Sequence, residues 1–113
     1  MRRIGVLLFG LLLVPGLSGS VAAQTAEEGM KVFVAQKCSL CHSVAGKGNK
    51  NGALDSVGVK LTAAEIRQWI VAPVEMAAKA KATRKPPMKA YPALSSANVD
   101  ALVAYLLTLK AAS

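Results

Sequence analysis

The chain has 113 residues, enough for one small domain, and it carries 14 lysines and arginines against 6 acidic residues. Hydrophobic residues make up 53% of the chain but aromatic residues only 4%, so few large rings are available to fill a core. A domain of this size and composition is marginal by side-chain burial alone, which predicts that a further element stabilises it.

The segment 1–23 has the pattern of an export signal. Two arginines are followed by an apolar run over residues 4–14 and by small residues over 21–23. We expect a Sec-type signal peptide cleaved after this segment, a mature domain over residues 24–113 and a periplasmic location. The apolar run is shorter than the roughly 20 residues of a transmembrane helix. The mature chain is therefore expected to have no transmembrane segment, with a retained N-terminal anchor as the alternative.

The first helix is expected over about residues 26–37. Thr25 and Glu28 have the spacing of a capping box at its start. Gly29 lies on the same side as Phe33 and would allow another helix to approach closely. The loop that follows, residues 43–60, is rich in glycine and has little periodicity, so we expect it to be irregular.

The second helix is expected to open at a capping box formed by Thr62 and Glu65, and Pro73 limits its length. Residues 74–80 have room for one or two further helical turns. Three prolines then forbid a regular helix over residues 86–92, which places Met88 in a stiff, extended loop.

The third helix is expected to begin at Ser95 or Ser96 and to end near Lys110. Its apolar residues recur at helical spacing, at Val99, Leu102, Val103 and Leu106. Because no segment alternates like a strand, the sequence predicts an all-α fold, a compact globule of three or more short helices.

The stretch CSLCH, residues 38–42, holds both cysteines and the only histidine of the chain. Its C-x-x-C-H spacing is the attachment signature of c-type haem: each thiol adds to one haem vinyl group, and His42 becomes an axial ligand of the iron. A zinc site would need a fourth ligand, a thioredoxin-like site would need neighbouring strands, and a disulfide between Cys38 and Cys41 would stabilise little. One covalently attached haem c would supply the missing core.

The segments GMKVFVAQKCSLCH (29–42) and PPMKAYPALSSANVDALVAYLLTLK (86–110) resemble class I c-type cytochromes, the small monohaem electron carriers, over essentially the whole mature chain. The resemblance implies that Met88 is the second axial ligand. A thioether is a soft ligand that suits haem iron, and His/Met ligation raises the reduction potential. Met76 is the alternative ligand, with packing beside Trp69 as its simpler interpretation.

The resemblance also implies three weaker roles. The carbonyl of Ala53, which stands where the family usually has a proline, is expected to accept the Nδ1 hydrogen of His42. Trp69 resembles a tryptophan whose indole meets a haem propionate, although burial on a helix face explains it equally well. Phe33 and Tyr105 are interpreted as a helix-packing pair.

These patterns together predict a periplasmic, one-electron carrier that is not an enzyme, because two axial ligands leave no open position on the iron. The alternatives are a haem subunit of a periplasmic dehydrogenase or oxidase complex, and a haem-based gas or redox sensor. Redox proteins with acidic docking surfaces are the expected partners, and nucleic acid is not. The lysines expected to attract them flank the haem motif and the Met88 loop, at Lys37, Lys47, Lys50, Lys79, Lys81, Lys85 and Lys89.

Overall fold

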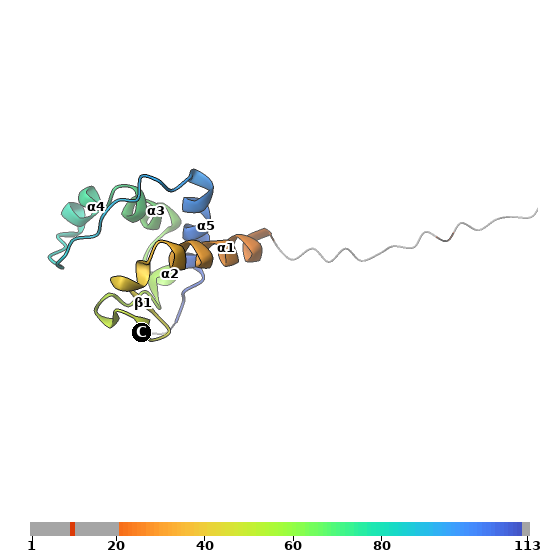
Figure 1. Ribbon diagram of the computed structural model, residues 1–113, viewed down its shortest axis with the longest axis horizontal. Coiled ribbons are helices and arrows are strands. Elements are labelled where there is room, and N and C mark those ends of the chain that lie inside the picture. The colour runs from red at the N-terminus through yellow and green to blue at the C-terminus, as the bar shows by residue number, and fades with distance from the viewer. Residues whose placement is uncertain (1–9, 11–20, 112–113) are drawn as a thin grey trace, which may run out of the picture.

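The computed structural model describes residue 10 and residues 21–111, so the predicted signal peptide lies almost entirely outside the described residues. The described part is predominantly helical (Figure 1). Its elements in chain order are α1 (Val21–Ala35), η1 (Cys38–Leu40), β1 (Ser43–Val44), β2 (Lys47–Gly48), η2 (Lys50–Gly52), α2 (Val57–Lys60), α3 (Ala63–Val71), α4 (Pro73–Ala80) and α5 (Ser96–Leu107), where η denotes a 3₁₀ helix.

Helix α1 begins earlier than the sequence predicted. Its first residue is Val21, so Thr25 lies inside the helix and is not its N-cap. The predicted capping box at Thr25 and Glu28 is therefore wrong. The residues before Thr25 are Val-Ala-Ala-Gln, which contain no helix breaker, so the helix continues through them. The helix ends at Ala35, and Lys37 then takes the left-handed conformation with φ of 56°.

The crossing of α1 and α5 is the main helix contact of the fold. A Cβ atom at Gly29 would lie only 1.9 Å from the carbonyl oxygen of Ala101, so only glycine permits the two backbones to approach this closely. One turn along, the rings of Phe33 and Tyr105 meet edge to face with centroids 5.7 Å apart. Both predictions for this crossing, the close approach at Gly29 and the packing of the aromatic pair, are confirmed.

Helices α3 and α4 follow each other with almost no connection. The predicted capping box of α3 is confirmed: the Thr62 hydroxyl accepts from the Glu65 amide at 3.2 Å, and the Glu65 carboxylate accepts from the Thr62 amide at 3.1 Å. Helix α3 ends at Val71, and Pro73 is the first residue of α4. An amide hydrogen at this position would have no acceptor within the helix, so proline is tolerated there.

The core lies where α1, α3 and α5 meet. Its buried cluster consists of Phe33, Ile66, Ile70, Val99, Leu102, Val103 and Leu106, and the partly buried residues around it include Cys38 and Leu54. Arg67 of α3 forms an exposed ion pair with Asp100 of α5 at the edge of this contact. The core thus reaches the segment that carries the cysteines.

The segment 43–60 is more regular than the sequence predicted. Strands β1 and β2 form an antiparallel pair in which Ser43 faces Gly48 and Val44 faces Lys47. The turn between them uses positive φ at Ala45 and Gly46. The expectation that this segment is an irregular loop is wrong, and an all-α description overlooks this one short hairpin, which is too brief for its alternation to be visible in the sequence.

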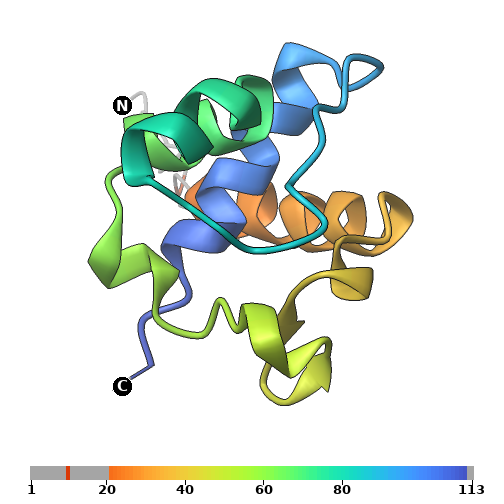
Figure 2. The ribbon, with the colours of Figure 1, turned by 90° about the vertical axis from the view of Figure 1, so that its left-hand side faces the viewer.

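The segment 81–95 runs across the front of the molecule before α5 begins, as Figure 2 shows. It contains no helix, in agreement with its prolines, and Met88 lies near its middle. Helix α5 begins at Ser96, as predicted, and Ser95 caps it by accepting from the amide of Asn98. The helix ends at Leu107 rather than near Lys110. Among the described residues, no helix has the length and apolar character needed to cross a membrane.

Candidate haem-binding site

The segment Cys38–His42, here called the attachment segment, is held as a tight turn. The amides of Cys41 and His42 both donate to the carbonyl of Cys38, at 3.1 and 3.0 Å. Both cysteines are free thiols; Cys38 is half-buried and Cys41 is exposed. Burial raises the pKa of Cys38, a backbone hydrogen bond opposes this, and the neighbouring Cys41 adds to the rise. The turn presents two free thiols three residues apart.

The imidazole of His42 has a defined orientation. Its Nδ1 atom lies 2.9 Å from the carbonyl oxygen of Gly52. Because a carbonyl only accepts, Nδ1 must carry the hydrogen, which leaves the lone pair on Nε2 free to bind a metal. The predicted acceptor, the carbonyl of Ala53, is therefore wrong by one residue. Ala53 instead lies in an isolated parallel bridge with Ser43, so its backbone runs alongside β1.

The environment of His42 favours its neutral form. Burial lowers its pKa, the hydrogen bond to the Gly52 carbonyl raises it, and the positive charge of Arg84 lowers it further. The net direction is downward from the ordinary value. A neutral imidazole is the form that binds metal, so this arrangement suits His42 to ligation at neutral pH.

Asn49, directly after the hairpin, donates hydrogen bonds to backbone carbonyls of the attachment segment. The amide of Asn49 donates to the carbonyls of Ser39 and His42, both at 3.1 Å, and its side-chain amide donates to the carbonyl of Leu40 at 3.3 Å. Sequence reasoning missed Asn49. An asparagine at the end of a short hairpin carries no signal of its own, because its partners become visible only in the folded chain.

The Met88 loop, residues 81–95, contacts the attachment segment through Arg84. Four residues before Met88, the guanidinium of Arg84 donates to the carbonyl of Cys41. Three residues after Met88, the pKa of Tyr91 is raised, mainly by burial and further by Cys38 and Cys41. Met88 lies between Arg84 and Tyr91 in the chain and is half-buried.

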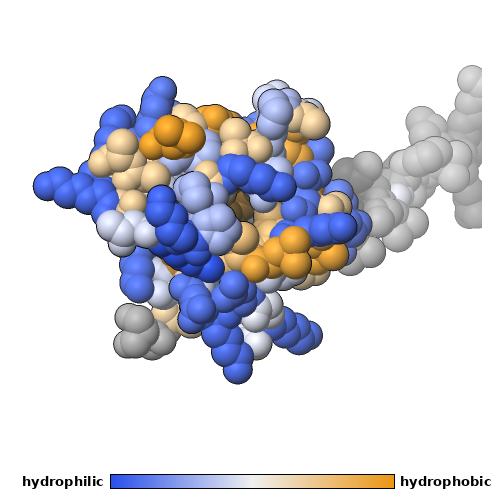
Figure 3. Space-filling model, turned by 60° about the vertical axis from the view of Figure 1, so that its left-hand side comes forward, coloured by the Kyte–Doolittle hydropathy of each residue, from blue (hydrophilic) through white to orange (hydrophobic). Residues whose placement is uncertain are grey.

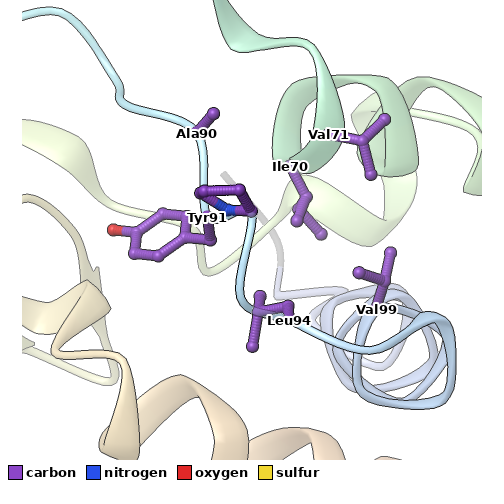
Figure 4. A pocket seen from close by; sticks show the side chains of 7 residues that line it. Ile70, Val71, Ala90, Tyr91, Leu94 and Val99 are labelled. Carbon is purple, nitrogen blue, oxygen red and sulfur yellow. The ribbon is translucent and has the colours of Figure 1, made fainter.

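The other side of Tyr91 closes a small apolar cavity of about 240 Å³ between the loop, α3 and α5. Figure 4 shows Ile70, Val71 and Val99 on the far side of this cavity and the ring of Tyr91 turned away from them. Leu94 of the same loop packs against the buried core, so the end of the loop is anchored there.

Trp69 and Met76 lie together elsewhere. Both line a groove of about 450 Å³ between α3 and α4, whose remaining lining residues are Leu61, Ala64, Glu65, Gln68, Lys79 and Ala80. The lining contains no residue of the attachment segment. This arrangement favours the interpretation of Met76 as packing beside Trp69 over its interpretation as a ligand.

The lysines proposed as docking charges, from Lys37 to Lys89, all lie on the surface. In Figure 3 hydrophilic side chains surround smaller hydrophobic patches on one face of the molecule. The ammonium of Lys89 lies over the ring of Tyr91, 5.7 Å from its centroid, so one of these charges is held against the Met88 loop.

Residues 26–110 match the family model of cytochrome c. The chain therefore belongs to the cytochrome c family, whose members carry covalently attached haem c with iron and transfer electrons to and from redox partners. No curated protein and no solved structure matches the chain. The resemblance to c-type cytochromes and the predominantly helical cytochrome c fold are thus confirmed.

The residues present fit this cofactor. Two free thiols have the required spacing on one turn, and the adjacent histidine has its Nε2 lone pair free. The Met88 loop is joined to that turn by the hydrogen bond from Arg84 to the Cys41 carbonyl.

Proposed function

We propose that this protein is an exported, periplasmic monohaem cytochrome c that carries single electrons between partner proteins. Cys38 and Cys41 bind the haem covalently, and His42 and Met88 ligate its iron. The haem iron supplies the one-electron couple. The observation that carries this proposal is the hydrogen bond from His42 to the Gly52 carbonyl, because it fixes the ring and leaves Nε2 unprotonated and able to bind iron.

The chain's own residues have three tasks in this function. The attachment segment holds the cofactor, Gly52 orients the proximal ligand and raises its basicity, and the Met88 loop keeps the second ligand in place. Family members are typically electron carriers. With both axial positions filled by side chains, no coordination site is open to a substrate, which supports a carrier rather than an enzyme.

Covalent attachment is tested by the intact mass of the protein purified from its native host. The expected mass is that of residues 24–113 plus one haem, and acidified organic solvent should leave the haem on the chain. Replacing Cys38 or Cys41 by alanine should impair maturation. Haem that is extracted to leave two free thiols would contradict the proposal, and retention of residues 1–23 would contradict only its signal-peptide part.

A further inference from the structure

Arg84 is the cation that links the two halves of the candidate site. It stands four residues before Met88, and its Nη2 donates to the carbonyl of Cys41, the residue directly before His42. A hydrogen bond from a charged donor is stronger than one between neutral groups. The contact joins segments more than forty residues apart in the chain, so it fixes the position of the Met88 loop relative to the attachment segment.

The space that the guanidinium occupies is created by a glycine. A Cβ atom at Gly52 would lie 2.1 Å from Nη1 of Arg84 and 2.1 Å from the carbonyl oxygen of Cys41. The same Gly52 supplies the carbonyl that orients His42. The absence of a side chain at residue 52 therefore allows one small region to hold the guanidinium, the Cys41 carbonyl and the acceptor of His42.

We propose that Arg84 is a positioning residue that fastens the Met88 loop to the attachment segment and thereby keeps Met88 on the iron. The inference rests on the proposed axial pair. A second consequence follows from charge: a cation beside His42 disfavours the more positive, oxidised iron and so raises the reduction potential. Because Arg84 is exposed, this electrostatic effect should weaken as salt is added.

Three variants of the haem-loaded protein separate these contributions. Arg84→Gln removes the charge and the fork of donors, and Arg84→Lys keeps the charge but replaces the planar guanidinium by a shorter ammonium that does not reproduce its geometry against the Cys41 carbonyl. Lys85→Gln is the matched control, since it removes an equal charge from the neighbouring exposed residue. The probe is imidazole, which binds the oxidised iron only when the methionine leaves.

Both Arg84 variants should bind imidazole about tenfold more tightly than the wild type, because a lost charged hydrogen bond releases the loop. The reduction potential should fall in Arg84→Gln, less at high salt, and stay nearer the wild-type value in Arg84→Lys. Lys85→Gln should match the wild type in imidazole affinity. Equal imidazole affinity in all three variants would overturn the proposal, and an unchanged potential in Arg84→Gln would overturn its electrostatic part.

Two further measurements separate this proposal from that of the axial pair. Met88→Ala should bind imidazole at least as tightly as the Arg84 variants; wild-type affinity in Met88→Ala would refute the ligand assignment. The midpoint of unfolding in guanidinium chloride measures how much the Arg84 contact stabilises the fold, and it does so whichever methionine ligates the iron. It should be lower in Arg84→Gln than in Lys85→Gln, and identical midpoints would overturn the role of Arg84.

Discussion

Single atoms set the chemistry of the candidate site. One carbonyl oxygen, that of Gly52, decides which nitrogen of His42 carries the hydrogen and which is free for iron. Met88 and Met76 are likewise the two candidates for the sulfur atom that ligates the iron. Met88 lies on a loop whose Arg84 donates to the attachment segment, whereas Met76 lines a groove with Trp69.

Replacing each methionine by alanine distinguishes these positions. Met88→Ala should keep the haem attached but turn the reduced iron into a site that binds carbon monoxide and has a lower potential, because its axial thioether is lost. Met76→Ala should lower the free energy of unfolding by about 2 kcal/mol through lost packing and leave the iron low-spin. Visible absorption spectra with and without carbon monoxide check both. Exchanged phenotypes would mean that Met76 is the ligand.

The sequence indicates the candidate haem-binding residues but not the groups that hold them in position. The spacing of Cys38, Cys41 and His42 is dictated by the cofactor, so it is visible as a motif. The contacts of Gly52, Asn49 and Arg84 each involve a backbone carbonyl whose partner lies far from it in the sequence, so only folding brings the two groups together. The acceptor was therefore misplaced by one residue, onto Ala53, and the two polar side chains were missed.

At the scale of elements, the helix termini and the α1–α5 crossing determine how the helices are arranged. Two similar capping-box sequences behave differently in this fold. Thr25-x-x-Glu28 and Thr62-x-x-Glu65 have the same spacing, but only the second forms a capping box. Leu61, directly before Thr62, has an extended backbone that separates α2 from α3. The residues directly before Thr25 are instead part of helix α1. A local pattern does not reveal whether the helix already exists upstream of it.

The α1–α5 crossing should be sensitive to a single methyl group. Gly29→Ala places a carbon atom against the backbone of Ala101, which forces the helices apart. We expect the free energy of unfolding to fall by about 1–3 kcal/mol. Met30→Ala, at the exposed neighbouring position, is the control and should change it by about 0.5 kcal/mol or less. Denaturant titration of both variants checks this, and equal midpoints would refute a tight crossing.

The N-cap of α3 offers a second, smaller test. Thr62→Ala removes the hydroxyl that accepts from the Glu65 amide, which should cost about 1 kcal/mol of unfolding free energy. The matched control is Thr83→Ala in the exposed loop, which should have little effect. If both threonine variants unfold at the same denaturant concentration, the capping box contributes nothing to stability.

The molecule as a whole presents a basic surface to its partners. Without Arg2 and Arg3 of the proposed signal peptide, 12 of the 14 basic residues remain against 6 acidic ones, and their field should speed the approach of an acidic redox partner more than it tightens the complex. Electron-transfer interfaces are small and short-lived, so the rate of association matters most. Lys85 and Lys89 flank Met88, and Lys89 also lies over the Tyr91 ring.

Charge reversal tests this surface. The double variant Lys85→Glu, Lys89→Glu should slow bimolecular oxidation by an acidic partner, most strongly at low salt, where the Debye length is about 30 Å at 0.01 M. The control, Lys60→Glu with Lys110→Glu, makes the same change in net charge at exposed positions outside the loop. Stopped-flow rates against ionic strength compare them. Curves that coincide for both variants would show that net charge alone, and no local docking surface, governs the encounter.

The α1–α5 crossing joins the two ends of the domain, and this has a consequence for the order of events as the protein is made. The main partner of α1 is α5, the last helix, so their contact cannot form until the C-terminal end of the chain has been synthesised. Until then the attachment segment belongs to an open chain. On the proposed function, this topology allows the haem to be joined to CSLCH before the helices close around it.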